Sequence, residues 1–231
     1  MSFDVSPAKD RPTLSLIVPL YNEAQALDEF FAVVIPILGK TSEDYEVICV
    51  NDGSQDETLP RLRQICQANP RIKVINLTRN FGKEVALTAG LDFAQGDAVI
   101  PIDADLQDPP ELIPVLIEKW RQGYDMVTTV RKDRRSDSIA KRLSADFFYK
   151  LVARMSVTPI PPHSGDYRLM DRKVVDALKQ LPERTRFMKG LFGWLGFQQT
   201  AVPYERPSRS AGQTKWNYWK LWNLGLEGIF S

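Results

Sequence analysis

The sequence predicts an α/β fold, in which a mostly parallel β-sheet is flanked by helices. Up to residue 131, short apolar runs rich in β-branched residues alternate with segments whose apolar residues recur at helical spacing. Such alternation implies right-handed βαβ units. Polar residues also follow each predicted strand, at the edge where parallel sheets bind ligands.

Three strands and two helices are expected first. Residues 13–21 (TLSLIVPLY) form a β-branched apolar run typical of a fully buried strand, and residues 45–51 (YEVICVN) predict a second buried strand. Residues 72–78 (IKVINLT) predict a third strand. Residues 22–38 place apolar side chains at helical spacing, with Asn22 as the expected N-cap, and residues 54–69 predict a second helix.

Two more helices alternate with two more strands. Residues 82–95 predict a helix that leads into a strand at residues 97–103 (DAVIPID). Residues 109–123 predict a helix that opens with two prolines, which suit a first turn, and residues 124–131 (YDMVTTVR) predict the fifth strand.

The alternation stops after residue 131. Residues 131–155 hold 8 Lys or Arg against 3 Asp, and a Pro-rich loop is expected at residues 158–166. A short helix is expected at residues 172–181 and a strand at residues 197–205.

Composition indicates a globular protein of one large domain or at most two, since 43% of its 231 residues are hydrophobic. Cys49 and Cys66 are expected to be small core residues in a reducing compartment. His163 is the only histidine, so histidine triads and multi-histidine metal sites are disfavoured. Residues 1–12 are polar, unlike a secretory signal, and the sequence contains no run of 18 apolar residues.

Charge is unevenly distributed along the chain. Residues 1–110 hold 9 Lys+Arg and 17 Asp+Glu, a net of −8, whereas residues 111–231 hold 21 and 12, a net of +9. The basic half suits phosphates or an anionic membrane surface, although a solvated charged surface explains the charge equally well. The overall charge of +1 argues against generic nucleic-acid binding.

The residues after the five strands are expected to line one site. They are Asn22, Glu23, Asp52, Arg79, Asp103, Asp105 and Arg131. The D-x-D spacing of Asp103 and Asp105 can place two oxygen donors around one Mg²⁺ or Mn²⁺, which relieves their repulsion and can grip a diphosphate. Asp108 before Pro109 fits a turn or N-cap residue.

Asp52, in the segment VNDGSQDET (50–58), has two explanations. It either shapes a tight turn or accepts hydrogen bonds from a base or sugar. Neither G-x-G-x-x-G nor G-x-x-x-x-G-K-[ST] occurs, which disfavours dinucleotide oxidoreductases and P-loop NTPases.

Five segments together resemble one known family. They are VPLYNE (18–23), VNDGSQDET (50–58), RNFGKEVALTAGLDFAQGD (79–97), DADLQDPPE (103–111) and SGDYRLMDRKV (165–174). They resemble the family 2 glycosyltransferases of GT-A fold, a Rossmann-like architecture, in the branch that loads sugars onto polyprenyl phosphates. The resemblance runs from about residue 13 to the C-terminus.

The resemblance implies roles for individual residues. The donor site would include Pro19, Tyr21, Glu23 and Asp52 around the base, Arg168 at the sugar, and Arg206, Arg209 and Lys215 in a loop at residues 205–215 that closes over the donor. Asp103, Asp105 and Gln107 would hold the metal, and Arg131, Arg142 and Ser144 the acceptor phosphate. Asp166 would lie at the reacting centre, as a base or as a residue that orients the sugar.

The C-terminal segment carries a separate expectation. From Lys215 onward, apolar and Trp residues recur at spacings of three to four, which predicts an amphipathic helix. We interpret residues 1–210 as the catalytic domain and residues 211–231 as a juxtamembrane helix, with transmembrane helices beyond it. Residues 146–155 are a second candidate for a membrane-facing helix. Packing of either helix on the protein's own core is the alternative.

The resemblance implies an inverting transferase at the cytoplasmic face of a membrane. Glucose would pass from UDP-glucose to a polyprenyl phosphate such as undecaprenyl phosphate, with Mg²⁺ or Mn²⁺ bound, and a homo-oligomer is possible. The alternatives are another UDP- or GDP-sugar (mannose or a modified arabinose), a soluble transferase to a saccharide hydroxyl, and a non-enzymatic nucleotide-sugar-binding module.

Overall fold

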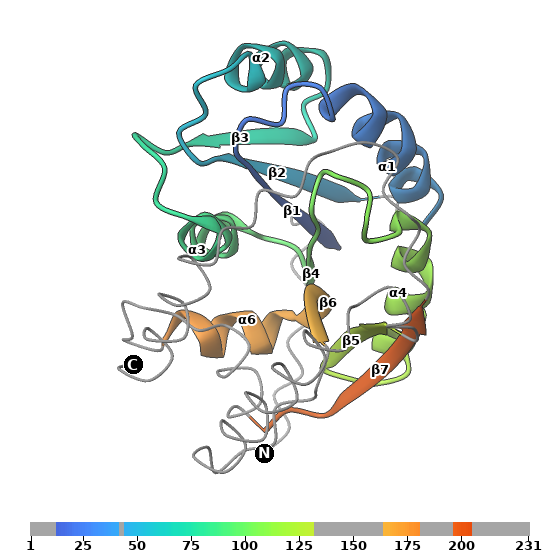
Figure 1. Cartoon of the computed structure of the whole chain (residues 1–231). Coiled ribbons are helices and arrows are strands. Elements are labelled where there is room, and N and C mark those ends of the chain that lie inside the picture. Colours follow the sequence, from blue (N-terminus) through green and yellow to red (C-terminus); the bar gives the residue numbers. More distant parts are fainter. Residues whose placement is uncertain (1–12, 42–43, 132–163, 181–195, 205–231) are drawn as a thin grey trace, which may run out of the picture.

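The computed structural model describes residues 13–41, 44–131, 164–180 and 196–204 (Figure 1). Its strands are β1 (Leu14–Leu20), β2 (Tyr45–Asn51), β3 (Ile72–Asn76), β4 (Ala98–Pro101), β5 (Met126–Arg131), β6 (Ser164–Asp171) and β7 (Gln199–Tyr204). Its helices are α1 (Leu27–Thr41), α2 (Thr58–Ala68), α3 (Lys83–Phe93), the short 3₁₀ helix η1 (Pro110–Leu112), α4 (Ile113–Arg121) and α6 (Arg172–Lys179).

The strands form one sheet in the order β3-β2-β1-β4-β6-β5-β7. Strand β6 is antiparallel to both of its neighbours, β4 and β5, and every other pairing is parallel. The sheet is therefore mostly parallel, as predicted. Because parallel strands end at a common edge, the residues after β1, β2 and β4 come together there.

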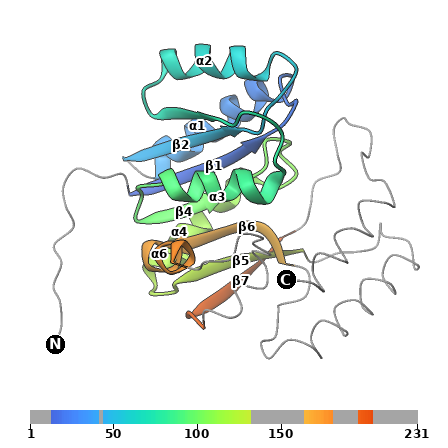
Figure 2. The same cartoon turned by 90° about the vertical axis from the view of Figure 1, so that its left-hand side faces the viewer.

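Helices cover both faces of this sheet, as Figures 1 and 2 show. Side chains of α1, α2 and α4 pack with Leu16, Val47 and Ile100 in one core cluster. Side chains of α3 and α6 pack with Ile17 and Ile48 in a second cluster on the other face. A strand alternates its side chains between two faces, so consecutive residues such as Leu16 and Ile17 serve different clusters.

Helix α3 can lie very close to the sheet because it contains Gly90 on its buried face. A Cβ atom at this position would lie 2.3 Å from Cγ2 of Ile17 in β1. The glycine thus sets how closely α3, and the loop that precedes it, approach the carboxyl ends of β1 and β2.

A buried carboxylate secures the opposite edge of the sheet. Glu46 of β2 is 3% exposed and accepts hydrogen bonds from Ser15 Oγ (2.6 Å), Lys73 Nζ (2.6 Å) and the Gln95 backbone N–H (2.7 Å). Burial opposes ionisation of Glu46, but these bonds outweigh it and lower its pKa. Since Gly96 N–H also donates to Ser15 Oγ (2.7 Å), the network fixes the turn that leads into β4.

Most predicted elements are confirmed, with ends that shift by a few residues. The Asn22 N-cap is wrong, because α1 begins only at Leu27 and Asn22 adopts a left-handed conformation (φ 55°) in the preceding turn. Strand β6 was not predicted as a strand. The parallel β-α-β pattern does not apply to it, since it enters the sheet antiparallel and between two earlier strands.

The prediction of a core position is confirmed for Cys49, which is fully buried, whereas Cys66 is only partly buried; both thiols are free. Burial raises the pKa of the Cys49 thiol well above its usual range. Within the described ranges, none of the helices combines the length and apolar character needed to cross a membrane.

Candidate active site

Two loops at the carboxyl edge are joined side by side. Asn22 N–H donates to Ser54 Oγ (3.0 Å), and Asn22 Oδ1 accepts from the Gln55 N–H (2.8 Å). The next residue, Glu23, donates its N–H to Thr58 Oγ1 (2.9 Å). Asparagine tolerates the left-handed conformation and its amide bonds nearby backbone, which explains why this residue type suits the position. The predicted donor residues after β1 are thereby fixed to those after β2.

Asp52 anchors a third loop. Its Oδ1 accepts the Phe81 N–H (2.7 Å) and its Oδ2 accepts the Gly82 N–H (2.9 Å), and the residue is 3% exposed. The neighbouring Gly53 has φ +64°, and a Cβ there would lie 2.3 Å from the Arg79 carbonyl carbon. The loop before α3 therefore lies against the turn after β2, where only glycine fits. A base contact by Asp52 stays a prediction.

Partly exposed rings lie in this anchored loop and directly after β1. The Arg79 guanidinium lies over the Phe81 ring, 4.1 Å from its centroid, and Phe81 is 42% exposed. Tyr21, after β1, is 39% exposed. Flat, partly exposed groups of this kind can stack on a planar ligand.

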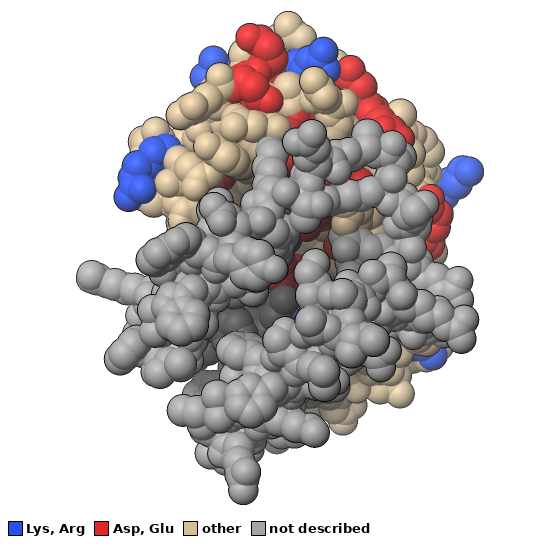
Figure 3. Space-filling model, viewed as in Figure 1, with Lys and Arg blue, Asp and Glu red and all other residues tan. Residues whose placement is uncertain are grey.

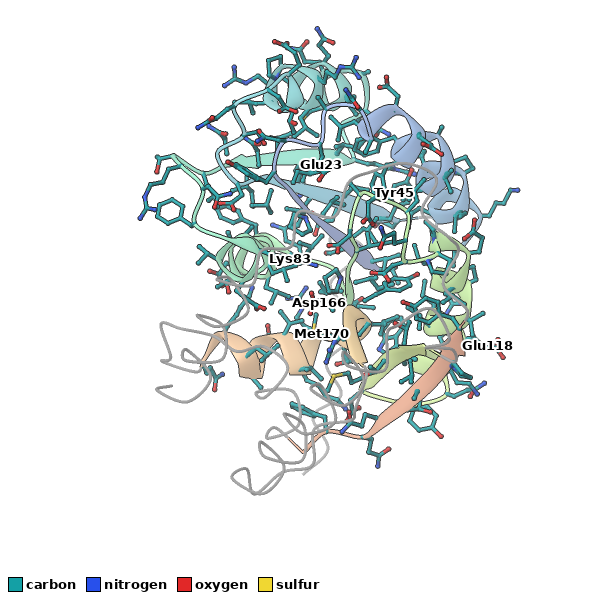
Figure 4. The ribbon with its side chains drawn as sticks, in the orientation of Figure 1. Glu23, Tyr45, Lys83, Glu118, Asp166 and Met170 are labelled. Carbon is teal, nitrogen blue, oxygen red and sulfur yellow. The ribbon has the colours of Figure 1, made fainter. Side chains whose placement is uncertain are left out.

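The centre of the site is an ion-pair cluster that joins three elements. Lys83, the first residue of α3, places its Nζ 2.7 Å from Asp103 Oδ1 and 2.9 Å from Asp166 Oδ2. Asp103 follows β4, and Asp166 lies in β6. Figure 4 shows Lys83 and Asp166 next to each other in the middle of the view, and acidic atoms are visible in the middle of the same view in Figure 3.

Electrostatics in this cluster favour the ammonium. Burial opposes the charge on Lys83, but the carboxylates of Asp103 and Asp166 outweigh it and raise its pKa. Burial raises the pKa of Asp103, and the nearby charges of Asp166 and Asp105 act in the same direction, while Lys83 opposes them. The carboxylates here repel one another, and the lysine offsets part of that repulsion.

The D-x-D turn continues from this cluster. Asp105 is exposed, and its Oδ1 accepts the Gln107 N–H (3.1 Å) across Leu106, which is left-handed (φ 54°). Gln107 is 6% exposed, and its Nε2 has no hydrogen-bond partner among the described residues. The nitrogen and oxygen of a side-chain amide are assigned rather than observed. If the Gln107 amide is rotated by 180°, its oxygen takes the place of Nε2 and is available as a metal ligand.

Of the two alternatives predicted for Asp108, the N-cap is wrong, and the residue lies in a bend before η1. Pro109 is the N-cap of η1, and no side chain caps this helix. Asp108 Oδ1 instead accepts the Tyr204 hydroxyl (2.9 Å), which ties the D-x-D turn to the end of β7. The tyrosine lies 96 residues away in sequence, which local capping rules do not consider.

Other predicted site residues lie at or below this edge. Pro19 is partly buried in β1, and the backbone of Arg131 pairs with Tyr204 at the end of β5. Arg168 is 2% exposed and its Nη1 lies 3.8 Å from Met126 Sδ. Burial lowers the pKa of Arg168 to about 10, against the opposing effect of Asp166 and Glu84. Arg168 thus lies beneath the surface of the site in this structure.

Several predictions lie outside the described residues. These are Arg142, Ser144, Arg206, Arg209, Lys215, the loop at residues 205–215 and the helices expected at residues 146–155 and 211–231.

A divalent cation is compatible with the site. Asp103, Asp105 and Gln107 offer the hard oxygen donors that Mg²⁺ and Mn²⁺ prefer. The Lys83 ammonium between two carboxylates already stands in for a cation. With this ammonium in place, the described residues contain no group of three or more acidic, Cys or His side chains arranged to hold a metal ion.

Sequence reasoning missed Lys83. A lysine in the first turn of a helix opposes the helix dipole, which favours acidic residues there. Its position after the third strand, in the segment NFGKE, was the available signal that the residue serves a site rather than its helix.

The sequence is similar to those of known proteins. Residues 15–179 match the sequence model of Glycosyl transferase family 2. An uncharacterized glycosyltransferase of Synechocystis is 59% identical over 94% of this chain and 69% of its own length. The bactoprenol glucosyl transferase of Shigella phage SfV is 50% identical over 94% of this chain and 71% of its own length.

Solved structures share the fold. A glucosyl-3-phosphoglycerate synthase from Mycobacterium tuberculosis, solved with Mn²⁺, UDP and phosphoglyceric acid, superposes with a TM-score of 0.60 at 21% identity. The match covers 94% of this chain and 75% of that structure.

Proposed function

Since the chain belongs to glycosyl transferase family 2 and has the GT-A fold, we propose that it transfers glucose from UDP-glucose to a polyprenyl phosphate such as undecaprenyl phosphate. The observation that carries this proposal is the 50% identity to a bactoprenol glucosyl transferase over 94% of the chain. The carboxylate cluster at the carboxyl edge supports the same chemistry, because a nucleotide-diphosphate donor needs a cation there.

Two groups of residues serve the donor in this proposal. Pro19, Tyr21 and Glu23 would face the nucleoside together with Asp52 and the loop it anchors. Asn22 and Glu23 tie this segment to the residues after β2. Asp103, Asp105 and Gln107 would hold Mg²⁺ or Mn²⁺, which neutralises charge on the nucleoside diphosphate as it leaves.

The acceptor needs a different kind of help. Its phosphate oxygen is already anionic at pH 7, so it requires positioning rather than deprotonation. Arg131, Arg142 and Ser144 supply that hold through charge-assisted hydrogen bonds. In the reaction the bond from sugar C1 to the donor phosphate breaks, a bond from C1 to the acceptor phosphate forms on the opposite face, and the nucleoside diphosphate leaves with the electron pair.

Asp166 is assigned the orientation of the sugar. No proton has to be removed from the acceptor, and the Asp166 carboxylate is already held by Lys83 at 2.9 Å. A hydrogen bond from a sugar hydroxyl to its other oxygen would fix the ring for attack.

The assay measures sugar transfer into an organic-extractable lipid. The protein is incubated with undecaprenyl phosphate, Mn²⁺ and a panel of radiolabelled UDP- and GDP-sugars, with Asp105→Asn as the inactive control. UDP-glucose should give the most product in the organic phase. Transfer from another nucleotide sugar would reassign the donor, and transfer only to saccharide acceptors in water would refute the lipid phosphate.

We also propose that residues 1–210 form the catalytic domain and that residues 211–231 lie on the cytoplasmic face of a membrane. Trp216, Trp219 and Trp222 suit the headgroup region, and basic side chains add about 1 kcal/mol each near an anionic surface. Replacing the three tryptophans by Ala should abolish salt-sensitive binding to anionic liposomes and leave UDP binding unchanged. Loss of UDP binding would mean that they are core residues.

A further inference from the structure

Lys83 holds an unusual position for a residue at the metal end of a transferase site. Its Nζ contacts Asp103, one of the two D-x-D carboxylates, and Asp166, the residue assigned to the sugar. The lysine comes from a helix, and its two partners come from the end of one strand and the interior of another. The Lys83 ammonium therefore occupies the position beside Asp103 where a divalent metal ion would bind.

Solvent can reach all three groups. Their side chains are between 25% and 40% exposed, so an incoming cation has access to Asp103 from outside. Lys83 Nζ contacts both oxygens of Asp103, Oδ1 at 2.7 Å and Oδ2 at 2.8 Å. A divalent ion against either oxygen would be strongly repelled by the ammonium. Metal binding at Asp103 consequently requires Lys83 to move away.

The long side chain of lysine makes such a movement inexpensive. Lysine carries a compact point charge on a flexible four-carbon stem, unlike the rigid guanidinium of arginine. The backbone before Lys83 is fixed independently, because Asp52 accepts the Phe81 and Gly82 N–H groups. The ammonium can therefore leave Asp103 without any change in the loop.

We propose that Lys83 is a built-in counter-ion, which competes with the divalent cation for Asp103 and turns to the donor diphosphate when cation and nucleotide bind together. This inference rests on the metal-dependent transferase proposed above. Its consequence is that Mn²⁺ alone binds weakly, whereas UDP strengthens Mn²⁺ binding by offering the displaced ammonium a new partner. Lys83 is thus a positioning residue that makes metal binding depend on the donor.

The test measures Mn²⁺ affinity by calorimetry, first without nucleotide and then with saturating UDP. Lys83→Met should bind Mn²⁺ alone about tenfold more tightly than the wild type, equal to about 1.4 kcal/mol. UDP should then strengthen Mn²⁺ binding less in the variant than in the wild type. Lys83→Gln, which also lacks the charge but keeps a polar group, should behave as Lys83→Met does and guards against a folding defect of the methionine variant.

Two control variants isolate the cause. Lys83→Arg keeps the charge, so its Mn²⁺ affinity without nucleotide should stay near the wild-type value. Lys40→Met removes the same charge from the exposed last turn of α1, at the other end of the sheet, and should change neither affinity.

Unchanged or weaker Mn²⁺ binding in both uncharged variants would overturn the proposal, because it would show that Lys83 supports the carboxylates rather than competing for them. No sugar or lipid is used, so a failed transfer assay leaves this result interpretable. Absence of Mn²⁺ binding in every protein, even with UDP, would overturn the metal site and this inference together.

Discussion

Replacing Asp52 with Asn tests whether this residue acts mainly as a loop anchor. Its two oxygens accept the Phe81 and Gly82 N–H groups at 2.7 and 2.9 Å, and the side chain is almost fully buried. Asparagine keeps the shape but turns one acceptor into an NH₂ group that faces an N–H donor. One charge-assisted bond is lost outright, and the other becomes neutral.

The expected size follows from the hydrogen bond that disappears. A hydrogen bond to a charged group contributes about 1.5–3 kcal/mol, so we expect the free energy of unfolding to fall by about 2 kcal/mol. For a chain of this length that corresponds to a fall in melting temperature of roughly 4–8 °C. In the variant, UDP has to order the loop when it binds. If that ordering costs about the same 2 kcal/mol, the affinity of the protein for UDP falls by at most about 30-fold.

The assay combines urea unfolding with calorimetric titration of UDP in the presence of Mn²⁺. Asp56→Asn is the matched control, because Asp56 lies in the same turn but is exposed. Its Oδ1 contacts with Thr58 survive in the amide, and its Oδ2 loses only the longer, exposed bond from the Ala24 N–H (3.3 Å). The control should lose less than about 1 kcal/mol. If Asp52→Asn unfolds like the control while UDP affinity collapses, Asp52 contacts the nucleotide directly and the anchoring argument is refuted.

Three further predictions concern the metal, the acceptor and pH. Asp105→Asn should lower turnover by about 100-fold or more. Asp108→Asn should lower turnover much less, because an amide oxygen still accepts the Tyr204 hydroxyl. Similar losses for the two variants in a steady-state assay would contradict this prediction. Arg131→Ala should weaken use of the lipid phosphate and leave UDP-glucose affinity intact, and calorimetry showing a loss of donor affinity would place Arg131 at the diphosphate instead. The pKa of Glu46 is lowered in the folded state, so its contribution to the free energy of unfolding is full above about pH 4.5 and is lost as pH falls through the folded-state pKa. Glu46→Gln should therefore reduce the fall in the free energy of unfolding at acid pH, measured by urea unfolding. An unchanged fall would exclude Glu46 as its source.

The fold was predictable where local pattern decides structure. Strands β1, β2 and β4 are apolar runs that are buried along almost their whole length, and the helices between the strands have helical spacing. Strand β3, at the edge of the sheet, is only partly buried. Strand β6 was missed because it is not a continuous apolar run between two helices. Asp166 and Arg168 lie on one face and Tyr167 and Leu169 on the other, an alternation that is typical of antiparallel strands.

The site was predictable in its membership but not in its contacts. Asp103 and Asp166 were both predicted as site residues, yet no local rule predicts that one lysine joins them across 20 and 83 residues of sequence. Asn22 was misjudged for a similar reason. Its amide bonds Gln55 in another loop, so it could not serve the helix that follows it.

The place of β6 in the sheet also determines the order in which this protein can assemble during folding or synthesis. β4 and β5 are consecutive strands in the chain, but they do not pair; each is hydrogen-bonded to β6, which follows β5 by more than 30 residues. The four strands β3-β2-β1-β4 connect through local units and can form early, whereas closure of the distant pairing is slow. A nascent chain that ends before residue 164 would hold the nucleoside side of the site and lack Asp166, so the reacting centre is completed after the nucleoside side.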